Sequence, residues 1–302
     1  MLRELYQNLL KHYCKRTFLF WQRLGIHVVQ RHFYEPIPDT RTLDDSIWEN
    51  HSELVGLDIN ERVQLDLLAR FKTAFKNEYD QFPMEKTDKQ QEYYVHNGMF
   101  GPVDGEILYC MLRDIKPKRV IEIGSGYSTL LISKALSVNR SDCDYACDYV
   151  VVDPFPNGTV KDGLPHLSRL EKKPVQKIPF SEFERLEEND MLLIDSSHVV
   201  AIGSDVQYLF LEVLPRLKKG VYISFHDIFL PAEYRKKWVL KEHVFWNEQY
   251  LLQAFLAFNN SFEILWAGSY MHINHSNELK TAFSSYDPQP RWPGGFWVRK
   301  IK

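Results

Sequence analysis

The sequence is poor in cysteine and in long apolar runs, and it has no strong excess of either charge. Its 302 residues include only four cysteines, too few and too irregularly spaced for a disulfide framework. Cys143 and Cys147 are separated by three residues rather than two, and no second cysteine pair accompanies them, which disfavours a metal or redox site there. Cys14 and Cys110 stand alone. We therefore interpret all four as reduced thiols and expect a cytoplasmic protein.

No apolar stretch approaches the roughly 20 residues that cross a bilayer, and the N-terminus lacks a secretory hydrophobic region. The formal net charge is -3, with 25% charged and 44% hydrophobic residues. This composition is typical of a globular protein and gives no indication of a nucleic-acid partner. The length favours one principal domain with a substantial addition.

Residues 1–34 are basic and amphipathic. They carry six Lys and Arg residues against one acid, Glu4, interleaved with Leu, Phe, Tyr and Trp at helical spacing. One interpretation is peripheral contact with an anionic membrane surface or with a partner. The other, which we favour, is a helix packed on the main domain, because long Lys and Arg stems commonly cover apolar surface.

Pro36 and Pro38 end that basic segment. A further helix begins after Asp58 or Asn60, either of which can cap it. Residues 1–95 are therefore predicted to form a mostly helical N-terminal extension.

From residue 116 onward, short apolar runs alternate with helical patterns. The runs at 119–123, 149–152, 191–194 and 221–225 are typical of strands buried on both faces. Helices are expected at 128–138 and 205–217, and two later strands at 262–266 and 296–301. This alternation predicts a doubly wound α/β sheet within a domain spanning residues 96–302.

The first strand leads into a glycine-rich turn, Glu122-Ile123-Gly124-Ser125-Gly126-Tyr127-Ser128-Thr129. Thr129 stands where a dinucleotide fingerprint requires a third glycine, and no phosphate-binding Gly-Lys-Ser/Thr follows. Glu122 would repel a pyrophosphate but would suit an ammonium group. The alternative for Glu122 is a strand residue held by neighbouring backbone donors.

Polar residues also follow the other strands, and in a doubly wound sheet the ligand binds beyond those carboxyl ends. Asp153 can accept hydrogen bonds from ribose hydroxyls, unless it only forms the turn before Pro154. Asp195 and His198 follow the fourth strand, and the pair His226-Asp227 follows the fifth.

These motifs resemble the class I S-adenosylmethionine-dependent methyltransferases, and within them the macrocin-type sugar O-methyltransferases. The resemblance covers about residues 95–302 and is carried by residues 120–126, 151–153, 193–195 and 226–228. It implies a Rossmann-like sheet of seven strands, the last antiparallel at residues 296–301. It also implies that S-adenosylmethionine binds at Glu122, Gly124, Gly126 and Asp153. We assign Ser125, Ser128 and Asp195 to the same cofactor site.

The candidate catalytic residues are His198, His226 and Asp227. Imidazole titrates near neutral pH and can remove a hydroxyl proton, while Asp195 and Asp227 can orient the imidazoles. Asp195, His226 and Asp227 are also the candidate ligands of a divalent metal ion. Metal-dependent relatives have a second Asp where this chain has His226, a ligand that suits softer metals than magnesium, so the need for a metal stays open.

The predicted function is O-methylation of a hydroxyl on a carbohydrate or glycosylated metabolite, with a small-molecule or glycan acceptor. The aromatic segment 229–246 is either a lid over that acceptor or an ordinary cover for the sheet edge. Two alternatives remain: a nicotinamide-dependent oxidoreductase, which Thr129 and Glu122 disfavour, and a non-catalytic scaffold that uses the basic N-terminal helix. Homo-oligomerisation is left open.

Overall fold

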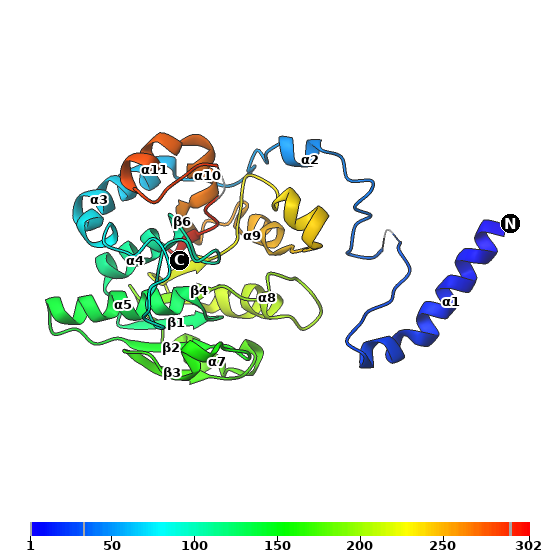
Figure 1. Ribbon diagram of the computed structural model, residues 1–302, viewed down its shortest axis with the longest axis horizontal. Coiled ribbons are helices and arrows are strands. Elements are labelled where there is room, and N and C mark those ends of the chain that lie inside the picture. Colours follow the sequence, from blue (N-terminus) through cyan, green and yellow to red (C-terminus); the bar gives the residue numbers. More distant parts are fainter. Residues whose placement is uncertain (1, 33, 290–291) are drawn as a thin grey trace.

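The computed structural model describes residues 2–32, 34–289 and 292–302. At its centre lies a seven-stranded sheet in the order β3-β2-β1-β4-β5-β7-β6 (Figure 1). The strands are β1 Arg119–Ile123, β2 Asp148–Val152, β3 Leu167–Glu171, β4 Met191–Ile194, β5 Tyr222–Phe225, β6 Phe262–Ala267 and β7 Phe296–Lys300. Strand β7 is antiparallel to both of its neighbours, and the other pairs are parallel. The predicted sheet is confirmed, including its antiparallel last strand.

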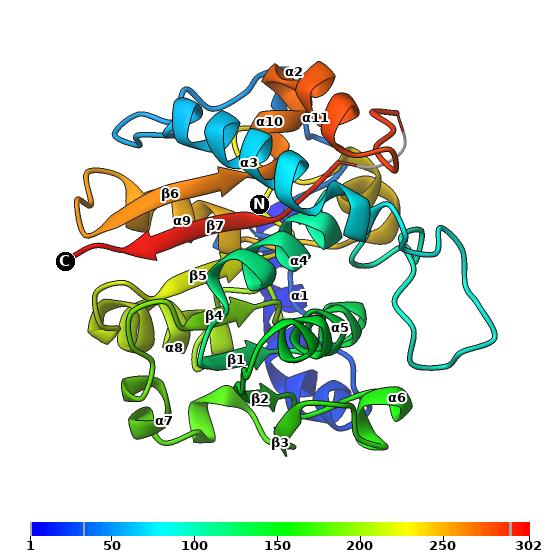
Figure 2. The same cartoon turned by 90° about the vertical axis from the view of Figure 1, so that its left-hand side faces the viewer.

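Helices cover both faces of the sheet, because alternate strand residues point to opposite sides. Val120 contributes to one buried cluster together with α3 Glu61–Tyr79, α4 Asp104–Ile115 and α5 Tyr127–Asp142. Ile121 and Ile123 contribute to the other cluster, with α7 Phe180–Glu184, α8 Asp205–Tyr208 and α9 Glu248–Leu256. Figure 2 shows the sheet between these groups of helices.

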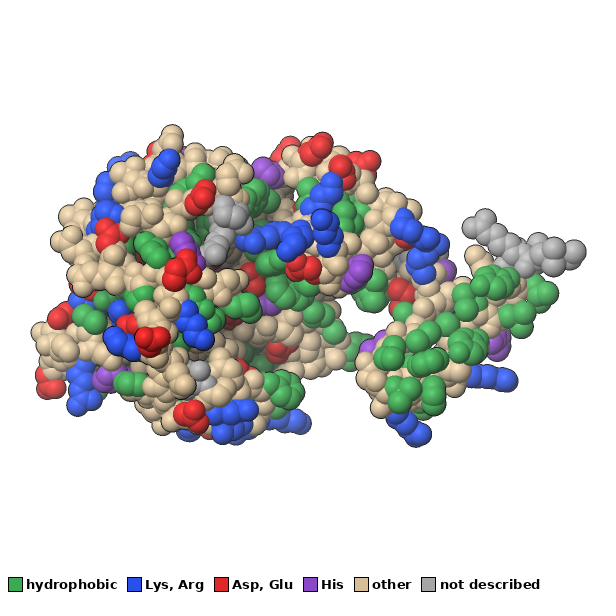
Figure 3. All heavy atoms as spheres, viewed as in Figure 1, with side chains coloured by type: hydrophobic (Ala, Val, Ile, Leu, Met, Phe, Trp, Pro, Cys, Tyr) green, Lys and Arg blue, Asp and Glu red, His purple; other side chains and the backbone are tan. Residues whose placement is uncertain are grey.

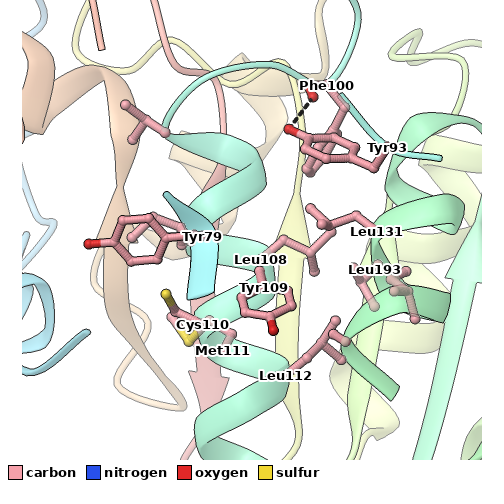
Figure 4. Close-up of a cluster of buried hydrophobic side chains, with 14 of the residues drawn as sticks. Tyr79, Tyr93, Phe100, Leu108, Tyr109, Cys110, Met111, Leu112, Leu131 and Leu193 are labelled. Atoms are coloured by element: carbon pink, nitrogen blue, oxygen red, sulfur yellow. Dashed lines mark hydrogen bonds between the residues drawn. The ribbon is translucent and has the colours of Figure 1, made fainter. Parts of the chain in front are cut away.

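The first of these clusters fixes the start of α4, which matters for the site. Leu108 and Leu112 of α4 are fully buried near Leu131 of α5 (Figure 4). At the edge of the cluster the hydroxyl of Tyr93 donates a 3.0 Å hydrogen bond to the carbonyl oxygen of Phe100. The loop that leads into α4 is thus anchored in the core rather than left as an exposed connection.

The N-terminal region differs from the prediction. It contains α1 Leu2–Arg23, α2 Ser46–Glu49 and α3, with irregular chain at residues 24–32, 34–45 and 80–103. Helix α1 stands apart from the body of the molecule (Figure 1), and its apolar side chains are mostly exposed. The favoured interpretation, a helix packed on the main domain, is therefore wrong for α1.

Helix α3, in contrast, packs on the sheet. The backbone N–H of Ala267 in β6 donates to Gln64 Oε1 over 2.8 Å, and Asn60 Nδ2 donates to the carbonyl oxygen of Ile264. The side chain of Asn60 thus binds the sheet instead of capping α3. A division of the chain at residue 95 stays a prediction.

Two further elements differ from expectation. The helix predicted at 205–217 ends at Tyr208 and continues as a π-helical turn, Leu209–Val213, and a 3-10 turn, Leu214–Arg216. Pro215 explains the break, because proline has no N–H for a helix interior. The resemblance implied a third strand, but no run of residues had been assigned to β3. The remaining short helices are α6 Gly158–Lys161, η1 Val175–Lys177, η4 Trp238–Glu242, α10 Gly268–Asn274 and α11 Ser276–Ala282.

Candidate active site

The glycine-rich turn lies where the ends of β1 and β4 come together. Gly124 has φ +88°, and a Cβ atom there would lie 1.8 Å from the backbone oxygen of Asp195. Only glycine tolerates both the left-handed backbone and this contact. A Cβ at Gly126 would instead meet no atom within 4 Å. The turn is therefore packed against the protein at Gly124 and open at Gly126, which is the side a ligand can approach.

Glu122 does not face that open side. Its carboxylate is buried and accepts hydrogen bonds from Ser128 Oγ, over 2.6 Å, and from the hydroxyl of Tyr149. Burial raises the pKa of Glu122 to about 7, although both hydrogen bonds act to lower it. Two predicted cofactor residues, Glu122 and Ser128, thus bind each other, tying the end of β1 to the start of α5. The donors are side chains, not the backbone groups considered from the sequence.

Asp153 lies at the neighbouring strand end, after β2. Its carboxylate accepts a hydrogen bond from Ser125 Oγ and another, of 2.7 Å, from the backbone N–H of Phe155. The side chain is only partly buried. The predicted cofactor residues Ser125 and Asp153 are therefore brought together beside the turn, and Asp153 also has the turn-forming contact that was the alternative.

The acids and histidines after β4 and β5 form one compact cluster. His198 Nε2 lies 3.3 Å from Asp195 Oδ1 and 3.7 Å from Asp227 Oδ2. His226 Nδ1 lies 3.6 Å from Asp195 Oδ1 and 3.7 Å from Asp227 Oδ2. Both aspartates thus face both imidazoles. One ligand atom each from Asp195, His198 and Asp227 lie within 4.8 Å of one another, a grouping that could hold a metal ion.

Two buried carboxylates that the sequence analysis missed complete this cluster. The carboxylate of Glu248, at the start of α9, is hydrogen-bonded to His198 Nδ1 over 2.8 Å. The backbone N–H of Glu248 also donates to the carbonyl oxygen of His198. Asp104, at the start of α4, lies 3.5 Å from His226 Nε2. Each imidazole therefore has a carboxylate behind it, so its orientation is fixed by the protein.

Asp104 also holds the chain that leads into β7. Its two carboxylate oxygens accept hydrogen bonds of 2.9 Å and 2.8 Å from the backbone N–H groups of Gly294 and Gly295. A Cβ at Gly294 would lie 3.0 Å from the Cα of Asp227. The two glycines thus let the backbone pass close to both Asp104 and Asp227.

The charges in the cluster support one another. Burial alone would lower the pKa of His198, but hydrogen bonds to Asp195 and Glu248 outweigh it and raise the pKa to about 10. Burial likewise opposes the charge on His226, yet Asp227 and Asp195 raise its pKa well above the usual value. The two imidazoles in turn hold the pKa of Asp195 far below its ordinary range, despite burial. Without a metal, the neighbouring carboxylates thus favour the imidazolium form of both histidines.

Aromatic side chains enclose the cluster on two sides. The ring of Phe100 stacks on His226 at a centroid distance of 4.5 Å, and the ring of Trp246 lies 4.3 Å from that of His198. Trp238 packs against Trp246 at 5.2 Å. The predicted aromatic segment 229–246 therefore reaches the candidate catalytic residue His198, although Phe229 and Tyr234 within it are buried and structural.

The chain is similar to several known proteins. Residues 121–228 match the family model described as a methyltransferase domain. A protein of Archaeoglobus fulgidus, described as uncharacterized, is 29% identical over 168 residues, which are 52% of this chain and 73% of that protein. The SAH-bound methyltransferase PaMTH1 of Podospora anserina has 16% identity and a TM-score of 0.41, over 80% of this chain and 88% of its own. A SAM-dependent methyltransferase from Anabaena variabilis has 12% identity and a TM-score of 0.34, over 84% and 100%.

The matched segment contains the glycine-rich turn, Asp153 and the whole of the acid and histidine cluster except the carboxylates of Asp104 and Glu248. Together with the sheet order, this match shows that residues 121–228 are similar to a methyltransferase domain. Among the described residues, no helix is both long and apolar enough to span a membrane.

Proposed function

We propose that this protein transfers the methyl group of S-adenosylmethionine to a hydroxyl oxygen of a carbohydrate or of a glycosylated metabolite. The observation that carries the proposal is the arrangement along one sheet edge. The open turn at Gly126 and the carboxylate of Asp153 lie beside a cluster that combines Asp195 and Asp227 with two oriented histidines. The turn and Asp153 suit the methyl donor, and the cluster of aspartates and histidines suits a hydroxyl that must lose a proton.

On the donor side, the residues present fit S-adenosylmethionine. A Cβ at Gly126 would occupy space that is open, so a ligand can lie against the backbone there. Asp153 keeps acceptor capacity for two ribose hydroxyls, because its carboxylate offers about four lone-pair sites and uses two. When bound, the cofactor supplies an electrophilic methyl carbon on a sulfonium. We assign Gly124, Ser125 and Gly126 to cofactor binding. Glu122 and Ser128 stabilise the turn through their buried hydrogen bond.

On the acceptor side, the chain's own groups must place a hydroxyl in line with the methyl carbon and take its proton. The O–C bond forms as the C–S bond breaks, and the hydroxyl proton passes to the cluster. Because the raised pKa values favour the imidazolium form of both histidines in the metal-free chain, we assign them as donors that orient the hydroxyl oxygen. Burial raises the pKa of Asp227, which makes this carboxylate the better proton acceptor of the two aspartates.

The cluster also fits a divalent metal ion. Asp195, His198 and Asp227 would hold it, with the Nδ1 atom of His226 close to both aspartates. A metal there would lower the pKa of a bound hydroxyl. Imidazole and carboxylate donors together suit manganese, iron, cobalt or zinc better than magnesium. The sequence analysis assigned His226 rather than His198 as the ligand, and we now propose His198 because Glu248 orients it from behind, as carboxylates do for metal-binding histidines.

The carbohydrate acceptor is supported by two partly buried side chains, Trp246 beside His198 and Trp238 packed against Trp246. The apolar face of a sugar ring stacks on such side chains. We expect labelled methyl groups to appear on a panel of sugar acceptors and to survive treatment with alkali, because an ether is stable to alkali whereas a methyl ester is not. Transfer only to carboxylate acceptors would overturn the assignment of a hydroxyl.

Cofactor binding is tested separately by calorimetric titration with S-adenosylmethionine and S-adenosylhomocysteine. We expect both to bind, and Asp153→Ala to weaken binding at least tenfold without lowering the unfolding temperature. Asp144→Ala removes an exposed carboxylate that precedes β2, whereas Asp153 follows the opposite end of that strand, and is the matched control. Absence of binding by folded protein would refute the donor assignment. Equal affinities of the two variants would remove Asp153 from the site.

A chelator separates the two roles proposed for the cluster. If a metal is held, EDTA should abolish transfer and Mn²⁺ or Zn²⁺ should restore it, while Asp195→Asn should prevent the restoration. Transfer that is unaffected by EDTA would show that the aspartates and histidines act on the proton directly.

A further inference from the structure

Helix α1 presents a continuous apolar stripe to its surroundings. Residues four or seven positions apart lie on the same face of a helix, and five large side chains follow that spacing. They are Leu5, Leu9, Tyr13 and Phe20 of the helix and Leu24 directly after it, which are 58%, 62%, 51%, 58% and 59% exposed. At about 1.5 Å per residue, the 22-residue helix is roughly 33 Å long. Nearly its whole length therefore carries exposed apolar side chains on one side.

The opposite face of α1 is covered by the chain that follows it. Gly25, with φ +75°, turns the chain at the end of the helix. The ring of Phe18 then lies 5.7 Å from that of His27, and Cys14 is buried. A hollow of about 560 Å³ between α1 and the returning chain is lined by both Cys14 and Val28. The chain that follows α1 thus packs against one face of the helix and leaves the apolar stripe uncovered.

Basic side chains lie within the stripe. Arg16 lies three residues after Tyr13 and four before Phe20, within the line of apolar side chains, and Arg23, like Arg16, is exposed. Residues 1–34 hold six Lys and Arg against one acid, whereas the whole chain has a net charge of -3. Long Arg side chains can lay their stems along an apolar surface while the guanidinium reaches a phosphate. Figure 3 shows apolar and basic side chains together on this projecting helix.

The rest of the described surface offers no counterpart for this stripe within a second copy. Large apolar side chains exposed on the body, such as Phe155, Ile202 and Leu211, lie on separate elements. Parallel pairing of two α1 helices through the stripe would bring the Arg16 side chains of both copies together, and likewise the Arg23 side chains, which costs free energy. An anionic membrane, with an apolar interior and negatively charged headgroups, matches both the apolar side chains and the basic side chains of the stripe.

We propose that α1 lies flat on an anionic membrane surface, with the stripe in the lipid and the basic side chains among the headgroups, and that it holds the methyltransferase domain there. The helix rests on the membrane and does not cross it. The inference does not depend on the identity of the methyl acceptor.

The test is sedimentation of the full chain with vesicles of phosphatidylcholine alone and of phosphatidylcholine with about one-third phosphatidylglycerol. We expect the protein to pellet with the anionic vesicles and to remain largely in solution with the neutral ones. The double variant Leu9→Glu/Phe20→Glu should reduce partitioning into anionic vesicles more than tenfold. Ile202→Glu/Leu211→Glu makes the same change of charge at exposed apolar positions of the body and should pellet as the native chain does.

A third variant, Arg16→Gln/Arg23→Gln, keeps the stripe and removes two cations. Each cation near an anionic surface is worth about fivefold in partitioning, so this variant should bind more than tenfold less. Circular dichroism and unfolding temperature establish that all variants are folded. Failure of the native chain to pellet with anionic vesicles would overturn the proposal. Equal losses of vesicle binding in Leu9→Glu/Phe20→Glu and Ile202→Glu/Leu211→Glu would also overturn it. The same holds if the native chain forms a dimer that does not pellet with vesicles and that Leu9→Glu/Phe20→Glu dissociates.

Discussion

Replacing Glu122 with glutamine should change the pH dependence of folding stability in a defined way. Glu122 is buried beneath the glycine-rich turn, and its pKa rises from 4.5 to about 7 in the folded chain. Between these two pH values the folded protein keeps a proton that the unfolded chain has released. The folded state therefore loses stability as the pH rises from about 4.5 to about 7, and no further loss from this group occurs above that range.

The size of the effect follows from the shift. A pKa difference of one unit corresponds to about 1.4 kcal/mol, so the rise from 4.5 to about 7 corresponds to about 3 kcal/mol. Glutamine has the shape of the protonated side chain and does not titrate. The difference in unfolding free energy between Glu122→Gln and the native chain should thus increase by about 3 kcal/mol in favour of the variant between pH 4.5 and pH 8. Altered hydrogen bonds to Ser128 and Tyr149 add an offset that is the same at every pH.

Urea unfolding at several pH values measures this difference directly. Glu184→Gln removes an exposed carboxylate and serves as the control. A difference that does not change between pH 4.5 and pH 8 would refute the assignment of a raised pKa to Glu122. Titration of the same variant with S-adenosylmethionine tests the ammonium interaction predicted from the sequence, which requires weaker binding by the variant at pH 8.

Three other substitutions test the packing of the site. Gly124→Ala should lower the free energy of unfolding by more than about 3 kcal/mol, because its Cβ would clash with the backbone of Asp195 in a left-handed conformation; an unfolding midpoint within error of the native value would contradict this. Gly126→Ala should unfold close to the native midpoint yet bind S-adenosylhomocysteine at least tenfold more weakly in calorimetry, and native affinity would show that no ligand approaches that side. Glu248→Ala should cost about 3 kcal/mol in urea unfolding, because it leaves the buried His198 Nδ1 without its partner; a smaller loss than that of an exposed Glu→Ala substitution would show that this contact does not form.

The sequence predicted the central sheet well because its strands are buried on both faces. The continuous apolar run at residues 191–194 is β4 with the same bounds. Strand β3 has no such signal, since Ser168 and Arg169 are exposed at the edge of the sheet and only pairing with β2 makes the segment a strand. The position of α1 was not predictable either. Its amphipathic pattern specifies a helix with one apolar face, but not what that face contacts.

At the site, sequence reasoning found the residues that directly follow strands and missed those that arrive from elsewhere. Asp195, His226 and Asp227 stand at strand ends, where parallel topology gathers them. Asp104 and Glu248 lie at the starts of helices far along the chain, and no local pattern marks a carboxylate that will face a distant histidine. Glu122 shows a different limit. Its place in the turn was clear, but the direction of its side chain depends on which sheet face Tyr149 and Ser128 occupy.

The link from Asp104 to Gly294 and Gly295 has a consequence for the order of assembly. Strand β7 is made last and inserts between β5 and β6, so β6 has no neighbour in the sheet until β7 arrives. The same stretch of chain brings the two glycines to Asp104, behind His226. Closing the sheet and finishing the active site are thus a single event. A chain interrupted before residue 294 would leave the edges of β5 and β6 that face β7 unpaired and free to bind strands of other chains. It would also lack the contact that holds Asp104 in place. Incomplete copies should therefore aggregate rather than persist as inactive enzyme.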